Sequence, residues 1–135
     1  KVITNVVKIK GTRANKVIVT SSWGFIIVYE TEIREKQEFY LIEVFTINGS
    51  LINCIEVPFQ VENWFTWSSF DDFDYLVLAT KDNQIFSCEV FYLNFHLITS
   101  IHNEDIIGIE YDPTLKIIII PTKSCKIIML PYVFE

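Results

Sequence analysis

Long apolar runs are missing from this chain of 135 residues. A membrane-spanning helix needs about 18 or more consecutive apolar residues. The longest apolar stretch covers residues 116–134, and Pro121, Lys123, Lys126 and Pro131 interrupt it. The sequence therefore excludes a helix that crosses a membrane.

Cysteine, glycine and proline are all scarce. The three cysteines, Cys54, Cys88 and Cys125, form an odd set without the spacing of a disulfide framework, which indicates reduced thiols and a cytoplasmic location. Glycine and proline occur only four times each, and this composition is not typical of disorder. We therefore expect a folded, cytoplasmic protein.

Basic residues are absent from the middle of the chain. No lysine or arginine lies between Lys36 and Lys81, whereas seven acidic residues lie there, and the formal net charge of the chain is −6. An acidic segment of this kind repels phosphate groups, so we expect no nucleic-acid partner. The basic residues of segment 1–16 are interpreted as solvated strand ends and loops.

Residue patterns that would support catalysis or metal binding are missing too. His96 and His102 are flanked by Cys88 and Cys125, but none of these residues has the close spacing of zinc ligands. The acidic segment 71–74 lacks the glycine and the terminal glutamate of a calcium loop. We therefore expect no metal, no cofactor and no enzymatic activity.

The abundant residues favour β-structure. Hydrophobic residues make up 50% of the chain and aromatic residues 15%, and the apolar set is mainly isoleucine, valine, phenylalanine and tyrosine. These side chains suit a pleated, packed surface better than a helix. The composition predicts an all-β fold.

One pattern of strands occurs three times. A short apolar strand is followed by a turn and then by a denser apolar run, and these denser runs begin at residues 25, 75 and 117. A repeat of this length made only of strands is typical of β-propeller blades. We therefore expect about three antiparallel four-stranded blades of an incomplete, open β-propeller.

The repeat also predicts the boundaries of the blades. Residues 1–16 are expected to hold the outer strand of a preceding blade, within residues 2–9. Blades then follow over residues 17–57 and 58–101, and residues 102–135 form an incomplete blade. A closed propeller needs at least about four blades, so we expect a fragment of a larger protein. The unclosed blade faces are candidate surfaces for self-association.

Local patterns add detail to these blades. Asn48-Gly49 predicts a hairpin turn in which both central residues have positive φ. The polar segment 31–38 is either a long loop or an extended hairpin tip. The runs 76–79 and 117–120 are apolar without alternation, which predicts strands buried on both faces.

Four segments resemble a known family. Residues 45–52 (Phe-Thr-Ile-Asn-Gly-Ser-Leu-Ile) are similar to a hairpin near the end of the WD-repeat propeller that closes BEACH-domain proteins, the relatives of neurobeachin and the lysosomal trafficking regulator. Residues 21–30, 76–83 and 108–120 resemble the preceding hairpin, an Asp-Asn turn and the last blade of that propeller. The resemblance covers residues 17–130, although the Trp-Asp dipeptides of the family are absent.

This resemblance implies a large cytoplasmic scaffold that is associated peripherally with membranes and acts in vesicle and lysosome-related trafficking. The function predicted is therefore that of a non-catalytic protein-interaction scaffold with a protein partner.

Trp23 and Phe73 are the candidate partner-binding residues, because aromatic side chains anchor interfaces and these two lie in turns, where burial is difficult. An alternative is a complete small β-barrel that carries an apolar ligand, although segment 117–120 lacks the inward and outward alternation of a barrel strand.

Overall fold

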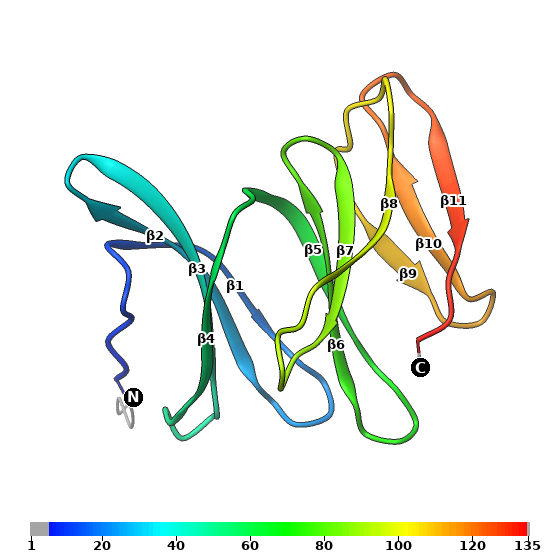
Figure 1. Ribbon diagram of the computed structural model, residues 1–135. Coiled ribbons are helices and arrows are strands. Elements are labelled where there is room, and N and C mark those ends of the chain that lie inside the picture. Colours follow the sequence, from blue (N-terminus) through cyan, green and yellow to red (C-terminus); the bar gives the residue numbers. More distant parts are fainter. Residues whose placement is uncertain (1–5, 135) are drawn as a thin grey trace, which may run out of the picture.

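The computed structural model describes residues 6–134, which form strands and loops without a helix (Figure 1). The predicted all-β fold is confirmed, and the strands belong to three antiparallel sheets. The first sheet contains β1 (Arg13–Val19), β2 (Ile26–Arg34), β3 (Gln37–Phe45) and β4 (Leu51–Val57). The second contains β5 (Val61–Ser68), β6 (Asp74–Thr80), β7 (Gln84–Glu89) and β8 (His96–Ser100). The third contains β9 (Glu110–Asp112), β10 (Ile117–Pro121) and β11 (Ile127–Pro131).

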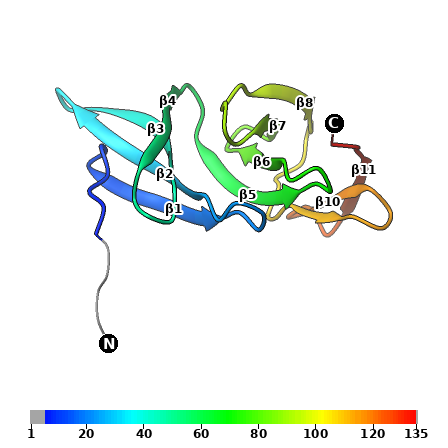
Figure 2. The same ribbon diagram turned by 90° about the horizontal axis from the view of Figure 1, so that it is seen from below.

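The three sheets are simple meanders that stand side by side (Figures 1 and 2). Strands that follow one another in the sequence are hydrogen-bonded neighbours within each sheet. β5, the first strand of the middle sheet, contacts β1 and β9, the first strands of the other two sheets. No sheet in the described part of the chain closes on itself, so these residues do not form the small barrel that was the alternative.

The boundaries of the sheets differ from the predicted blades at the start of the chain. Residues 1–5 lie outside the described residues, and residues 6–9, the rest of the expected outer strand, form no strand. β1 begins at Arg13 rather than near Val17. Its first residues, Arg13 and Ala14, pair with Thr31 and Glu30, because β2 continues to Arg34 and is long enough to pair with this extra length of β1.

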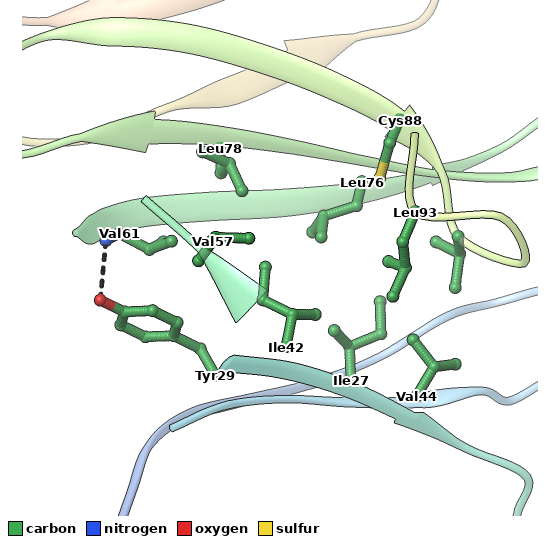
Figure 3. Close-up of a cluster of buried hydrophobic side chains, with 11 residues drawn as sticks. Ile27, Tyr29, Ile42, Val44, Val57, Val61, Leu76, Leu78, Cys88 and Leu93 are labelled. Atoms are coloured by element: carbon green, nitrogen blue, oxygen red, sulfur yellow. Dashed lines mark hydrogen bonds between the residues drawn. The ribbon is translucent and has the colours of Figure 1, made fainter. Parts of the chain in front are cut away.

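The first core lies between the first and second sheets (Figure 3). Its buried members are Ile27, Tyr29, Ile42, Val44, Val57, Val61, Leu76, Leu78, Cys88, Val90 and Leu93. The hydroxyl oxygen of Tyr29 accepts a hydrogen bond from the backbone N–H of Val61 at 3.1 Å, which ties β2 to the start of β5. Burial raises the pKa of Tyr29 to about 12.

The second core lies between the second and third sheets, and β6 contributes to both cores. Its members are Val77, Ala79, Ile85, Ile109, Ile118 and Ile120. Leu76 and Leu78 point into the first core, whereas Val77 and Ala79 point into the second. The prediction that segment 76–79 is buried on both faces is therefore confirmed, since every residue of β6 is buried.

The same prediction is wrong for β10. Ile118 and Ile120 are fully buried in the second core, but Ile117 and Ile119 on the other face are only partly buried. The reason is the position of the third sheet at the end of the stack, where no further sheet of residues 6–134 covers its outer face. A run of four isoleucines places apolar side chains on both faces of the strand, but another sheet covers only one face of β10.

A single turn design recurs in five loops. A serine or threonine side-chain oxygen accepts a hydrogen bond from a backbone N–H four or five residues later: Thr20 from Phe25, Thr46 from Ser50, Ser69 from Phe73, Thr80 from Gln84, and Thr122 from Lys126. The residue before each donor has a positive φ: Gly24, Gly49, Asp72, Asn83 and Cys125. Such a residue in the left-handed region closes a hairpin with a local bulge.

Two hairpins differ from their predicted form. At Asn48-Gly49 only Gly49 has a positive φ, of 87°, so the expectation of two such residues is wrong. The Gly49 N–H donates to the carbonyl of Thr46 instead, and the loop between β3 and β4 has five residues, 46–50. Segment 31–38 is the extended hairpin tip rather than a loop. Glu35 and Lys36 alone form its turn, and both have a positive φ.

Candidate functional site

Two turns from neighbouring sheets meet at one end of the molecule. The turn between β1 and β2 presents Ser22 and Trp23, and the turn between β5 and β6 presents Asp72. The Ser22 hydroxyl donates to Asp72 Oδ1 at 3.1 Å, and the indole Nε1–H of Trp23 donates to the carbonyl of Asp72. The Ser22 backbone N–H also donates to Ser68 Oγ at 3.1 Å. These bonds fix the position of Trp23 relative to the second sheet.

Asp74 adds two further hydrogen bonds to this junction. Asp74 is 3% exposed, and its carboxylate accepts hydrogen bonds from the backbone N–H of Trp23, at 3.2 Å, and from the Ser68 hydroxyl. A buried carboxylate without donors would cost several kcal/mol, and two donors offset this cost. Asp74 therefore acts as the connector that holds the two turns together.

A cavity of about 430 Å³ opens beside the junction. We name it the Trp23–Phe73 cavity, and its walls are Trp23, Phe25, Asp71, Asp72, Phe73, Asp74, Glu89, Phe91 and Tyr92. The volume lies within the range of about 300–1,000 Å³ that is usual for ligand pockets. The cavity lies between the first and second sheets, beyond the end of the first core.

Aromatic side chains in this cavity remain accessible. Trp23 is 62% exposed and Phe73 is 47% exposed, although both have their backbones anchored by hydrogen bonds. Trp23 stacks on Phe25 with ring centroids 6.4 Å apart, and Phe91 meets Tyr92 edge to face at 5.1 Å. Rings that are held in place yet exposed can bury area on a ligand at a small entropy cost.

The charge of the cavity has one sign. Four carboxylates and no basic side chain line it. Asp72 and Asp74 are engaged in the junction, whereas the carboxylates of Asp71 and Glu89 make no hydrogen bond or ion pair within residues 6–134. The cavity therefore combines aromatic walls with two carboxylates that are free to meet a ligand.

The sequence named two of these residues. Trp23 and Phe73 were selected separately, because each lies in a turn, and the structure places both on one cavity. Phe91, Tyr92 and Glu89 were missed. The only signal for them in the sequence is the aromatic pair Phe91-Tyr92, which directly follows β7. The acids of segment 71–74 match no calcium-loop pattern, and nothing in their local sequence indicates a cavity.

The histidines and cysteines that were candidate metal ligands or catalytic groups do not form a cluster in the described residues. His96 Nε2 lies 3.3 Å from the hydroxyl of Tyr132, and within residues 6–134 its side chain makes no hydrogen bond with His102 or a cysteine. Cys88 is buried in the first core, and burial raises the pKa of its thiol, which opposes thiolate formation. In residues 6–134 no group of three or more histidine, cysteine or acidic side chains is arranged to hold a metal ion.

A second group of ionisable residues is structural. Glu30 and Glu43 are buried on the face of the first sheet that lies away from the first core. The backbone N–H of Gly11 donates to Glu30 at 2.6 Å, and that of Lys10 donates to Glu43 at 2.8 Å. Burial, followed by the adjacent Glu43, raises the pKa of Glu30 to about 8. The pair anchors residues 10 and 11 on this face.

Comparison with models of protein families, with curated proteins and with solved structures finds no match to this chain. No helix in the described residues is long and apolar enough to cross a membrane.

Proposed function

We propose that the protein is a non-catalytic protein-interaction module, and that its binding site is the Trp23–Phe73 cavity. The observation that carries this proposal is a cavity with exposed aromatic walls, in which Trp23 is held in place by hydrogen bonds between two sheets. Aromatic residues are enriched among the anchors of protein interfaces. The described residues offer no nucleophile–base pair and no metal-binding group in this cavity that would favour catalysis.

We further propose that the three sheets are consecutive blades of an open β-propeller. Three features support this interpretation: each sheet is a meander, the sheets stack face to face on two cores, and their first strands lie next to one another. These features match the arrangement of blades around an axis. The cavity then lies at the boundary between two blades, where propellers combine side chains from different repeats.

The cellular setting of the module is proposed from the sequence resemblance alone. The similarity of segments 21–30, 45–52, 76–83 and 108–120 to the propeller of BEACH-domain proteins supports a scaffold role in vesicle or lysosome-related trafficking. In that setting the protein is cytoplasmic, reaches membranes only peripherally through its parent protein, and binds other proteins without a cofactor.

Selection of peptides from a random display library on the immobilised chain tests the binding function. We expect selected peptides to shift the NMR signals of the Trp23 indole and of the Phe73 and Tyr92 amides. Phe73→Ala should abolish these shifts. Phe70→Ala is the matched control, because Phe70 lies in the same turn and is fully exposed but does not line the cavity. Shifts confined to β10 and β11 would contradict the proposal.

A further inference from the structure

We propose that the Trp23–Phe73 cavity recognises the cationic side chain of a lysine or arginine in an extended segment of a partner protein. This inference rests on the proposed function and names the chemistry of the partner. Three observations carry it: the sign of the charge in the cavity, the aromatic walls, and the fixed positions of Trp23 and Asp74.

The charge of the cavity selects a cation. All four charged residues in its wall are acidic, and the chain between Lys36 and Lys81, which supplies three of them, contains no basic residue. The carboxylates of Asp71 and Glu89 make no hydrogen bond or ion pair within residues 6–134. A bound ammonium or guanidinium group would therefore gain charge-assisted hydrogen bonds without displacing an existing ion pair.

The aromatic walls fit the rest of a basic side chain. Lysine and arginine carry an apolar stem below the charged head, and such stems lie along apolar surface while the head stays polar. Trp23 offers the ring with the strongest attraction for a cation, and Phe73 and Tyr92 offer two more. An anion would meet four carboxylates, and a purely apolar ligand would remove Asp71 and Glu89 from water without a partner.

The cavity is also preorganised for this ligand. The indole N–H of Trp23 is bound to the carbonyl of Asp72, and its backbone N–H is bound to Asp74, so the ring does not have to be ordered on binding. Asp74 is already buried and satisfied by two donors. Binding therefore orders mainly the incoming side chain, which lowers the entropy cost of association.

The test uses a fluorescein-labelled nine-residue peptide of glycine and serine with two central lysines. A second peptide has norleucine at both lysine positions, and a third has glutamate there. Fluorescence polarisation gives the affinity, and the NMR signal of the Trp23 indole reports the site. We expect the lysine peptide to bind and to shift this signal, and the other two to bind at least roughly tenfold more weakly. Raising the salt from about 50 to about 300 mM should weaken the lysine peptide further, because screening shortens the reach of the carboxylates.

Charge-neutral variants provide the matched comparison. Asp71→Asn combined with Glu89→Gln should weaken binding of the lysine peptide roughly tenfold. Glu62→Gln removes the same kind of charge at the opposite end of β5, outside the cavity, and should leave the affinity unchanged.

The outcomes separate this inference from the proposed function. If the norleucine peptide, or library peptides without basic residues, shift the Trp23 signal as strongly as the lysine peptide, the cavity binds proteins but the cation inference is wrong. If no peptide shifts this signal, both are wrong. If tetramethylammonium alone binds with the affinity of the lysine peptide, the site recognises small cations, and the assignment of a protein segment is overturned.

Discussion

Among single residues, the acidic pair on the outer face of the first sheet has the most unusual environment. Glu30 is fully buried, and its carboxylate meets the backbone N–H of Gly11 and the neighbouring Glu43. A side chain added at Gly11 would come within 2.6 Å of this carboxylate, so glycine is needed for the close approach. The protonated form of Glu30 is favoured because burial opposes its charge.

This environment predicts a pH dependence of stability. The pKa of Glu30 is raised to about 8 in the folded chain and is ordinary in the unfolded chain. The folded state therefore holds the extra proton, and the free energy of unfolding should fall as pH rises from about 5 to about 8. Glu30→Gln should flatten this dependence and stabilise the protein at pH 8 by about 1 kcal/mol or more. Thermal unfolding between pH 5 and 9 measures both, and an unchanged slope in the variant would refute the assignment.

Cys125 offers a second prediction at the residue scale. Its φ is 64°, in the left-handed region, and its side chain is exposed. Glycine adopts this conformation without steric cost, so Cys125→Gly should stabilise the protein by about 0.5–1 kcal/mol. Cys125→Ala is the control, because alanine keeps the strain and removes only the thiol. Equal urea midpoints for the two variants would show that backbone strain at this turn is negligible.

At the scale of elements, the buried carboxylate of Asp74 contributes to the junction between the first and second sheets. Asp74→Ala would leave the Trp23 N–H and the Ser68 hydroxyl without their acceptor in a partly buried position. Loss of a buried, charge-assisted acceptor costs about 2–4 kcal/mol. We expect that decrease in the unfolding free energy from urea denaturation. Asp71→Ala, three residues earlier and exposed, should change it by less than about 0.5 kcal/mol, and a comparable loss there would contradict the role of Asp74.

The strands could be predicted from the sequence because their causes are local. Val77 and its neighbours form an unbroken apolar run between turn residues, and β6 is fully buried as that pattern indicates. The face of each strand was harder to predict. Ile119 is as apolar as Ile118, and only the absence of another sheet over it determines its partial exposure. Propensity also favoured a symmetric turn at Asn48-Gly49, whereas the hydrogen bond from Gly49 to Thr46 selects a longer loop.

The candidate site could be predicted only in part because its residues meet through tertiary packing. Trp23 and Asp72 are 49 residues apart in the sequence, and the hydrogen bonds that join them depend on how two sheets stack. Each turn can be predicted from its own residues, whereas no pattern in the sequence indicates the cavity between the two turns. Glu89 is an example. An acidic residue at the end of a strand does not by itself indicate that it shares a cavity with Trp23 and Phe25 of another sheet.

For the whole molecule, the two outer faces of the stack predict head-to-tail association. Val17 and Val19 on the first sheet alternate with Ile18, which packs on the first core, and remain more than half exposed. Ile127 and Met129 on the third sheet are about two-thirds exposed in the same way. Two different apolar sheet faces on one molecule give a heterologous contact, which propagates from copy to copy. Sedimentation velocity should therefore show association that increases with protein concentration.

Complementary variants test the geometry of this association. Val17→Glu blocks one face and Ile127→Glu blocks the other, so each variant alone should be monomeric. An equimolar mixture should form a heterodimer, because each variant supplies the face that the other lacks. Dimers of a single variant would instead indicate that a face pairs with itself, and the head-to-tail arrangement would be wrong.

The most direct test of the central claim is the dissociation constant of one display-selected peptide, measured on three forms of the full chain. The account predicts that Phe73→Ala weakens binding at least roughly fivefold, while Phe70→Ala, in the same turn but outside the cavity, binds like the unaltered protein. If Phe73→Ala binds as tightly as the unaltered chain, the Trp23–Phe73 cavity is not the binding site.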